Sequence, residues 1–339
     1  MMRSAPMALL ILGLAGAAGV WWFNYVIHAA MPVVEEGYTL EVERGTSLRA
    51  LAAQLGDAGI MPYPRAFSAY GRLTGQASRI QAGEYELEPG TTPAALLQQL
   101  VQGRVRLHAL TILEGWTVRE LLAAVAQHSA IRQTLKVESP ADLATALELE
   151  APHAEGWFFP ETYSFPRGTS DAQFLRTAHD LMRRKLAEAW AQRAVGTGLK
   201  DPYEALILAS IVERESALDS ERPMIAGVFI RRLQKGMRLQ TDPTVIYGLG
   251  ATFDGNLTRK HLKTDTPYNT YTRRGLPPTP ISLPGEAALL AAVNPDSGET
   301  LYFVASGRAD GSHVFTTTLE EHNAAVAEYL AELRRRKRK

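Results

Sequence analysis

The stretch between residues 201 and 216, which reads DPYEALILASIVERES, predicts a single buried helix. Asp201 is a suitable N-cap, Pro202 fits the first helical position, and Glu204 completes a capping pattern at the third. The residues that follow, up to 212, are almost wholly apolar. Most faces of this helix must therefore lie in a protein interior, surrounded by other elements of its domain.

One carboxylate near the end of this helix, that of Glu213, has an unusual setting. The residues three, four and seven positions before it share its face and are small or apolar: Ser210, Ala209 and Leu206. A carboxyl group there is partly desolvated, which raises its pKa toward the value that a general acid needs near neutral pH. Glu215 lies about 200° around the helix, on a different face. The alternative is a structural role, in which Glu213 pairs with Arg222 or Arg231.

Loops between residues 236 and 281 are rich in amide, hydroxyl and aromatic side chains, the groups by which proteins bind sugars. Four residues in these loops are candidates for substrate contacts: Gln240, Asp242, Asn269 and Tyr271. Alternatively, Tyr247 and Tyr271 are half-buried anchors of the loops, and Asp242 with Pro243 only starts a turn.

The N-terminus predicts a membrane anchor. In residues 7–27 the only strongly polar side chain is Asn24, and a helix of that length spans about 32 Å, enough to cross a bilayer core of about 30 Å. Aromatic residues typical of a membrane interface gather at its end: Trp21, Trp22, Phe23 and Tyr25. Arg3 favours a cytoplasmic N-terminus formed by residues 1–6, with the rest of the chain outside the inner membrane. A cleaved signal peptide is the alternative, but residues 28–31 read HAAM, a poor match to a cleavage site.

A linker at residues 28–37 precedes a small part at residues 38–104, where strand, Gly turn, hydroxyl N-cap and amphipathic helix follow one another. Residues 42–55 read VERGTSLRALAAQL, and a second strand is predicted at 83–87. This part resembles a LysM module, a small βααβ fold that binds N-acetylglucosamine chains of peptidoglycan, although it carries extra residues at 56–82. Turn chemistry alone is the alternative explanation, because many strand-to-helix turns favour Gly followed by Thr or Ser.

The larger part, residues 106–333, predicts an α+β domain. Mixed helices accompany short strands near residues 108–113 and 300–305. The chain ends in RRRKRK at residues 334–339. This basic tail is either a solvated helix end or a segment attracted to anionic lipid headgroups or wall polymers.

The composition excludes several classes of function. The absence of cysteine excludes disulfides, thiolate metal sites and cysteine nucleophiles. Thirty-six basic residues balance thirty-six acidic ones, so the chain lacks the net positive field of a nucleic-acid binder. No two histidines are spaced i,i+4, and no HExxH, P-loop, GxSxG or GxGxxG motif occurs. We therefore expect no metal, no cofactor and no nucleic-acid partner.

Several segments together resemble the endolytic murein transglycosylase family, in the order that the family has. They are EGWFFPETY (155–163), LASIVERE (208–215), LQTDPTVIYG (239–248), YNTY (268–271), GLPP (275–278), YFVA (302–305) and HVF (313–315). The resemblance covers roughly residues 110–325 and implies a catalytic domain that acts on nascent peptidoglycan strands in the periplasm, anchored once in the inner membrane. Peptidoglycan synthases are implied as further partners. The resemblance also implies that the glutamate of the IVE motif, Glu213, is catalytic.

The implied reaction needs only one carboxyl group. Protonated Glu213 would donate its proton to the glycosidic oxygen between N-acetylmuramic acid and N-acetylglucosamine. As a carboxylate it would then accept the proton of the muramyl 6-hydroxyl, which attacks C1 and leaves a 1,6-anhydro end. Such cleavage would terminate glycan elongation and remodel the wall. Two alternatives stay open: a non-catalytic, membrane-tethered scaffold that binds peptidoglycan, and a hydrolase with Glu215 or Asp242 as its second carboxylate.

Overall fold

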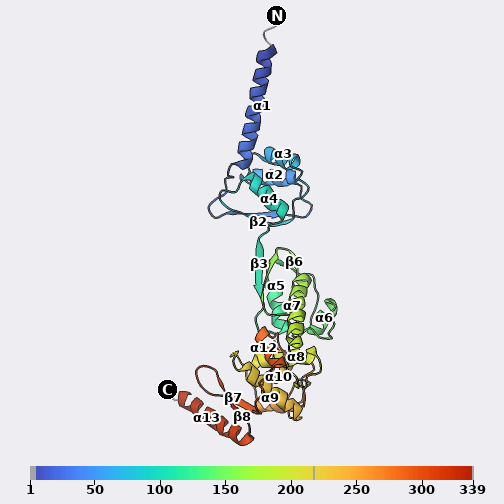
Figure 1. Ribbon diagram of the computed structural model, residues 1–339, viewed down its shortest axis with the longest axis vertical. Helices are drawn as coiled ribbons and strands as arrows, with labels where there is room; N and C mark the ends of the chain where they lie inside the picture. Colours follow the sequence, from blue (N-terminus) through green and yellow to red (C-terminus); the bar gives the residue numbers. More distant parts are fainter. Residues whose placement is uncertain (1–4, 217, 338–339) are drawn as a thin grey trace. The chain divides into compact units, whose positions relative to one another are not determined.

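The computed structural model describes residues 5–216 and 218–337, and the chain divides into two compact units (Figure 1). The first unit runs to His108 and takes in Ser164–Thr169, and the second holds the rest of the chain. Both units contain helices and short paired strands. The prediction of a mixed helix and strand protein is therefore confirmed.

The first unit contains a two-stranded sheet and four helices. In order, its elements are α1 (Ala5–His28), β1 (Tyr38–Val42), α2 (Leu48–Asp57), α3 (Pro64–Leu73), β2 (Gly83–Leu87) and α4 (Pro93–Gln102). β1 and β2 are antiparallel, with Tyr38 opposite Leu87. Ser47 and Thr92 cap α2 and α4, as the turn pattern predicts. The order β1-α2-α3-β2 buries one core that includes Leu40, Phe67 and Tyr85, each with no exposed surface.

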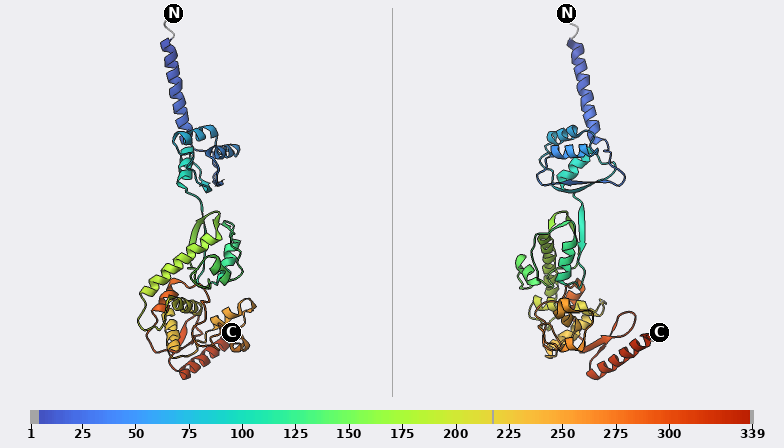
Figure 2. Two further views of the ribbon diagram at one scale, coloured as in Figure 1. Left: turned by 90° about the vertical axis from the view of Figure 1, so that its right-hand side faces the viewer. Right: turned by 180° about the vertical axis from the view of Figure 1, so that it is seen from behind.

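Within the first unit, α1 is one long helix that extends away from the other elements, as both views of Figure 2 show. Within the described residues it contains one stretch, Leu10–His28, that is long and apolar enough to cross a membrane by its length and composition, with a mean hydropathy of 1.6. Among the α1 side chains whose burial the structure describes, only Val26 and Ile27 are buried, and they pack against Ala66 of α3. Arg3, on which the expected orientation of the anchor depends, lies outside the described residues, as do the last two residues of the basic tail.

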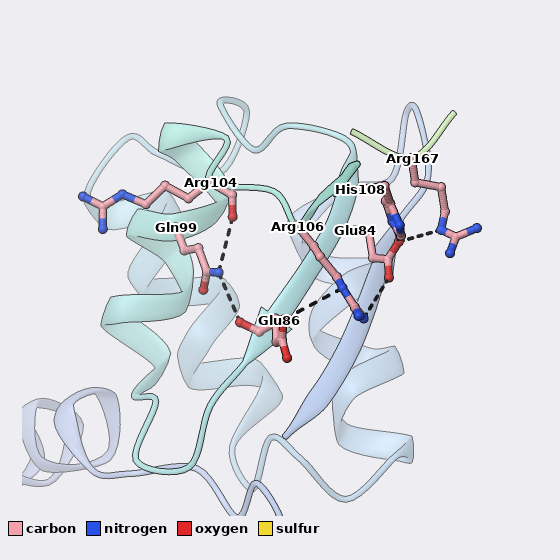
Figure 3. A network of polar contacts seen from close by, with 7 residues as sticks. All are labelled: Glu84, Glu86, Gln99, Arg104, Arg106, His108 and Arg167. Atoms are coloured by element: carbon pink, nitrogen blue, oxygen red, sulfur yellow. Dashed lines mark hydrogen bonds and ion pairs between the residues drawn. The ribbon is translucent and has the colours of Figure 1, made fainter. Parts of the chain in front are cut away.

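A buried carboxylate on β2, that of Glu84, is surrounded by cationic side chains (Figure 3). Arg167 Nε donates to Glu84 Oε2 at 2.5 Å, and His108 Nε2 lies 2.8 Å from the same oxygen. Burial by itself would raise the pKa of Glu84, but the hydrogen bonds and positive charges of Arg167 and His108 outweigh it and lower that pKa. These contacts explain why Ser164–Thr169, which is distant in sequence, belongs to the first unit.

The second unit is mostly helical, with α8 at its centre. Two further strands, β3 (Leu107–Thr111) and β5 (Thr162–Pro166), pair with each other. The other elements are α5 (Val118–Gln127), β4 (Ile131–Arg132), α6 (Pro140–Ala146), β6 (Thr169–Ser170), α7 (Asp171–Ala191), α8 (Pro202–Glu215), α9 (Arg222–Gln234), α10 (Asp242–Leu249), the short 3₁₀ helix η1 (Gly250–Thr252), α11 (Arg259–Lys263), α12 (Glu286–Val293), β7 (Tyr302–Ala305), β8 (His313–Thr316) and α13 (Leu319–Lys337). β4 pairs with β6, and β7 forms an antiparallel hairpin with β8. α8 packs against α7, α9 and α12.

The central helix α8 has the start and the burial that its sequence predicts. Asp201 Oδ1 accepts a hydrogen bond from the Glu204 N–H at 2.8 Å, and every residue from 205 to 212 is buried. Ser210 Oγ accepts from the Ile281 N–H at 3.0 Å, and the Ser210 carbonyl accepts from Ser282 Oγ at 3.0 Å. Ser210, the small polar residue within the apolar run, therefore binds the distant loop segment at Ile281 and Ser282 to α8.

Candidate active site

Glu213, the carboxylate that the sequence places on an apolar face, is enclosed, and each of its oxygens accepts a hydrogen bond. Its side chain is 4% exposed. Oε1 accepts from Arg222 Nη2 at 2.8 Å, and Oε2 accepts from the Gly285 N–H at 2.9 Å. Both the raised pKa and the pairing with Arg222 that the sequence suggested are therefore present. Burial raises this pKa, whereas the Gly285 N–H and Arg222 act in the opposite direction.

Glu215 has different surroundings, because it lines a cavity of about 550 Å³ in the second unit. Thr241 Oγ1 donates a hydrogen bond to Glu215 Oε1. Burial raises the pKa of Glu215 to about 7, and the negative charge of Asp242 adds to this effect, while Thr241 and the cations His313 and Arg232 oppose it. The volume lies within the range of about 300–1,000 Å³ that is usual for ligand sites. A carboxyl group with such a pKa can both give and take a proton near neutral pH.

Three of the four predicted substrate contacts line this same cavity, namely Gln240, Asp242 and Tyr271. Tyr271 Oη donates to Asp242 Oδ1 at 2.6 Å. Gln240 has a φ of +52°, a conformation that is uncommon for residues other than glycine and that holds its backbone in a sharp turn before α10. Asp242 with Pro243 starts the helix α10 rather than an isolated turn.

Asn269, the fourth candidate, does not line the cavity. It is fully buried, and its Nδ2 donates to three backbone carbonyls, the closest being that of Thr264 at 2.7 Å. Its Oδ1 accepts from the Tyr271 N–H at 2.8 Å. Asn269 thus positions the loop that carries Tyr271, and its polar atoms are already engaged.

The other side of the cavity contains residues to which the sequence assigned no role. Arg232 on α9 is buried, donates to the carbonyls of Leu301 and Leu239 at 2.7 Å each, and places its guanidinium 5.0 Å from the ring centroid of Tyr302. The ring of His322 on α13 stacks on the same Tyr302 ring, and the two ring centroids lie 5.2 Å apart. This wall of the cavity is therefore aromatic and cationic, which suits a polar, hydroxyl-rich ligand. The motif at Tyr302–Ala305 was the available signal for this wall.

A further carboxyl group, that of Glu155, lies apart from the cavity lining. It is 1% exposed, and its oxygens accept from the Val118 N–H at 2.8 Å and from Tyr247 Oη at 3.0 Å. Burial raises the pKa of Glu155 to about 7. Tyr247 also packs edge-on against Tyr268 at 4.9 Å. It is half-buried, as the alternative interpretation expects, but it lies in α10 and not in a loop.

The two carboxylates at the end of α8 therefore face different neighbours, as their spacing predicts. Glu213 points to the ion pair with Arg222 and to the backbone of Gly285. Glu215 points to Thr241 and to the cavity that holds most of the predicted substrate residues. Chemically, the second arrangement offers an acid–base group beside polar and aromatic side chains.

Comparison with known proteins gives consistent matches over most of the chain. The model of the YceG-like family matches residues 40–328. An endolytic murein transglycosylase from Bacillus subtilis (strain 168) is 31% identical over 329 residues, covering 91% of this chain and 90% of that protein. An endolytic murein transglycosylase from Streptococcus pneumoniae (serotype 2, strain D39) is 26% identical and covers 95% of this chain, which spans 64% of that longer relative. The crystal structure of a YceG-like protein from Listeria monocytogenes is 31% identical, with a TM-score of 0.54, and covers 86% of this chain and 99% of that one. The chain belongs to the YceG-like family.

Proposed function

We propose that this chain is a lytic transglycosylase that cleaves peptidoglycan glycan strands internally, between N-acetylmuramic acid and N-acetylglucosamine. The relatives from Bacillus subtilis and Streptococcus pneumoniae are named endolytic murein transglycosylases. The single observation that carries the proposal is the carboxyl group of Glu215, which opens into a polar and aromatic cavity with a pKa of about 7.

Glu215 is the acid–base group in this proposal, and Glu213 is the competing candidate. A catalytic acid must reach the glycosidic oxygen, and Glu215 lines the cavity. Both oxygens of Glu213 are already bonded, to Arg222 and to Gly285. The family resemblance and the apolar helix face had favoured Glu213, so the experiment must compare both residues.

The reaction proceeds by two proton transfers at one carboxyl group. Protonated Glu215 donates to the glycosidic oxygen while the bond between that oxygen and C1 of N-acetylmuramic acid breaks. The carboxylate then accepts the proton of the muramyl 6-hydroxyl, whose oxygen bonds to C1 and closes a 1,6-anhydro ring. Glu215 ends protonated, as it began, and no water is consumed. The neighbouring carboxylate of Asp242 stabilises the positive charge that develops on the sugar ring.

The proposal also assigns roles to the parts of the chain outside the cavity. α1 anchors the protein in the inner membrane, and the chain that follows it lies in the periplasm, where cleavage terminates glycan elongation beside peptidoglycan synthases. The first unit, with its β1-α2-α3-β2 order, contributes affinity for glycan strands in the manner of a LysM module.

Mass spectrometry of the products from purified sacculi tests the proposal. The full chain should release muropeptides with 1,6-anhydro ends. Release of reducing ends would replace the transglycosylase by a hydrolase, with Asp242 as the second carboxylate. Binding to sacculi without any release would establish the non-catalytic scaffold instead.

A further inference from the structure

A second large hollow lies in the first unit, beside the end of α1. This groove has a volume of about 990 Å³. The residues that determine its chemistry are Trp22, Arg49, Asp57, Tyr63, Arg65 and Arg72. Nothing in the proposed reaction uses it.

The groove is positively charged. The side chains of Arg49, Arg65 and Arg72 belong to exposed residues, and within residues 5–216 and 218–337 none of the three forms an ion pair. Arg72 makes only a long hydrogen bond, at 3.4 Å, to the carbonyl of Ser68. Asp57 is the one carboxylate in the lining, so three guanidinium groups face a single opposing charge. Unpaired guanidinium groups that converge on one groove favour a phosphate or another anion as ligand.

The position of the groove along α1 connects it to a membrane surface, given the anchoring role proposed above. Trp22 of α1 meets Tyr63 edge-on at 5.3 Å, and Phe23 packs near Tyr70 of α3. From Trp22 to His28 the helix rises only about 9 Å, so the groove begins where the aromatic end of the span meets the headgroups. Trp22 and Tyr63 remain 45% and 48% exposed, as side chains at a bilayer interface are.

We propose that this groove binds the headgroups of anionic glycerophospholipids from the leaflet in which α1 ends. The guanidinium groups of Arg49, Arg65 and Arg72 pair with the phosphodiester, and the rings of Trp22 and Tyr63 lie at the boundary between headgroup and acyl chain. Each arginine near an anionic surface contributes roughly fivefold in affinity, so the three together contribute roughly 100-fold. Bound lipid holds the first unit against the membrane surface.

The test uses the full chain in micelles of a neutral detergent, titrated with phosphatidylglycerol or phosphatidylcholine, with bound lipid counted by native mass spectrometry. The wild-type protein should bind phosphatidylglycerol in preference to phosphatidylcholine. The variant Arg49→Gln/Arg65→Gln/Arg72→Gln should lose about 100-fold in affinity for phosphatidylglycerol and keep its weak binding of phosphatidylcholine.

The matched control is Arg44→Gln/Arg79→Gln/Arg104→Gln, which removes three exposed arginines of the same unit that do not line the groove. It should bind phosphatidylglycerol as the wild type does. Equal affinities in both triple variants, or equal binding of the two lipids by the wild type, would overturn the proposal. So would displacement of phosphatidylglycerol by millimolar inorganic phosphate at constant ionic strength, since the site would then be one for free phosphate. No glycan is present in this experiment, so its outcome is independent of whether the chain cleaves peptidoglycan.

Discussion

Replacement of Arg222 by methionine should destabilise the second unit strongly, because it leaves the carboxylate of Glu213 buried without its cation. The side chains of Arg222 and Glu213 are 5% and 4% exposed, and their charged atoms lie 2.8 Å apart. Removal of one partner from an ion pair that is buried to this extent costs about 3–5 kcal/mol. That cost is a large part of a domain's free energy of unfolding, which is typically about 5–15 kcal/mol. Methionine retains the apolar stem of arginine, so the loss reports the charge rather than the packing.

The assay is urea unfolding at pH 7.5, followed by tryptophan fluorescence, with Glu213→Gln/Arg222→Met as the matched control. The double variant should recover at least half of the lost free energy of unfolding, because it buries no net charge. Lowering the pH should also stabilise Arg222→Met. The pKa of Glu213 is already raised in the folded state, and losing Arg222 raises it further, so stability is lost as the pH rises above the unfolded value of about 4.3.

Two results would refute this reasoning. A loss below about 1 kcal/mol in Arg222→Met would mean that water reaches Glu213 and solvates it. Strictly additive effects of Glu213→Gln and Arg222→Met would mean that the two groups do not interact. Either result would remove the main objection to Glu213 as a catalytic acid.

Three further predictions concern groups outside the cavity. The free energy of unfolding of Glu155→Gln should depend less on pH than that of the wild type. The pKa of Glu155 is about 7 in the folded state against 4.5 unperturbed, so the wild type loses up to about 3 kcal/mol of stability as the pH rises from about 5 to 8. Parallel profiles of stability against pH in the two proteins would contradict this. Ser210→Ala should lose about 1–3 kcal/mol in urea unfolding because the buried Ile281 N–H is left unpaired, and an unchanged midpoint would show that another acceptor replaces it. N-terminal sequencing of protein extracted from membranes should find the intact N-terminus, whereas a mature chain that begins near Met31 would identify residues 7–27 as a cleaved signal peptide.

The parts of the site that depend on local chemistry were predictable from the sequence. Asp201 and Pro202 predict the start of α8, and the helical period correctly separates Glu213 from Glu215. Loop composition alone led to Gln240, Asp242 and Tyr271, which do share one cavity. Each of these features is determined by residues that lie within a few positions of one another or that have a characteristic side-chain chemistry.

The choice between the two carboxylates was not predictable in this way, because it depends on contacts between distant segments. Gly285, whose N–H donates a hydrogen bond to Glu213, lies 72 positions further along the chain. The wall that Arg232 and Tyr302 form opposite Glu215 joins α9 to the hairpin β7–β8. Asn269 illustrates the same limit: an amide in a polar loop looks like a sugar contact, but whether it faces a cavity or the backbone is decided by the fold of the loop itself.

The most direct test of the account is the release of anhydro-muropeptides by folded Glu215→Gln and Glu213→Gln, measured by mass spectrometry beside circular dichroism. Glutamine keeps the volume of glutamate but cannot exchange a proton. At position 213 its single oxygen can accept only one of the two hydrogen bonds that Glu213 accepts, such as the one from the Gly285 N–H. Glu215→Gln should therefore lose about 10²–10⁴-fold in rate or more, since both proton transfers fail together. Glu213→Gln should stay within about tenfold of the wild type, because the Gly285 N–H retains an acceptor and no reacting group is removed. Near-normal turnover by Glu215→Gln, with activity lost in folded Glu213→Gln, would contradict the account and return the catalytic role to Glu213.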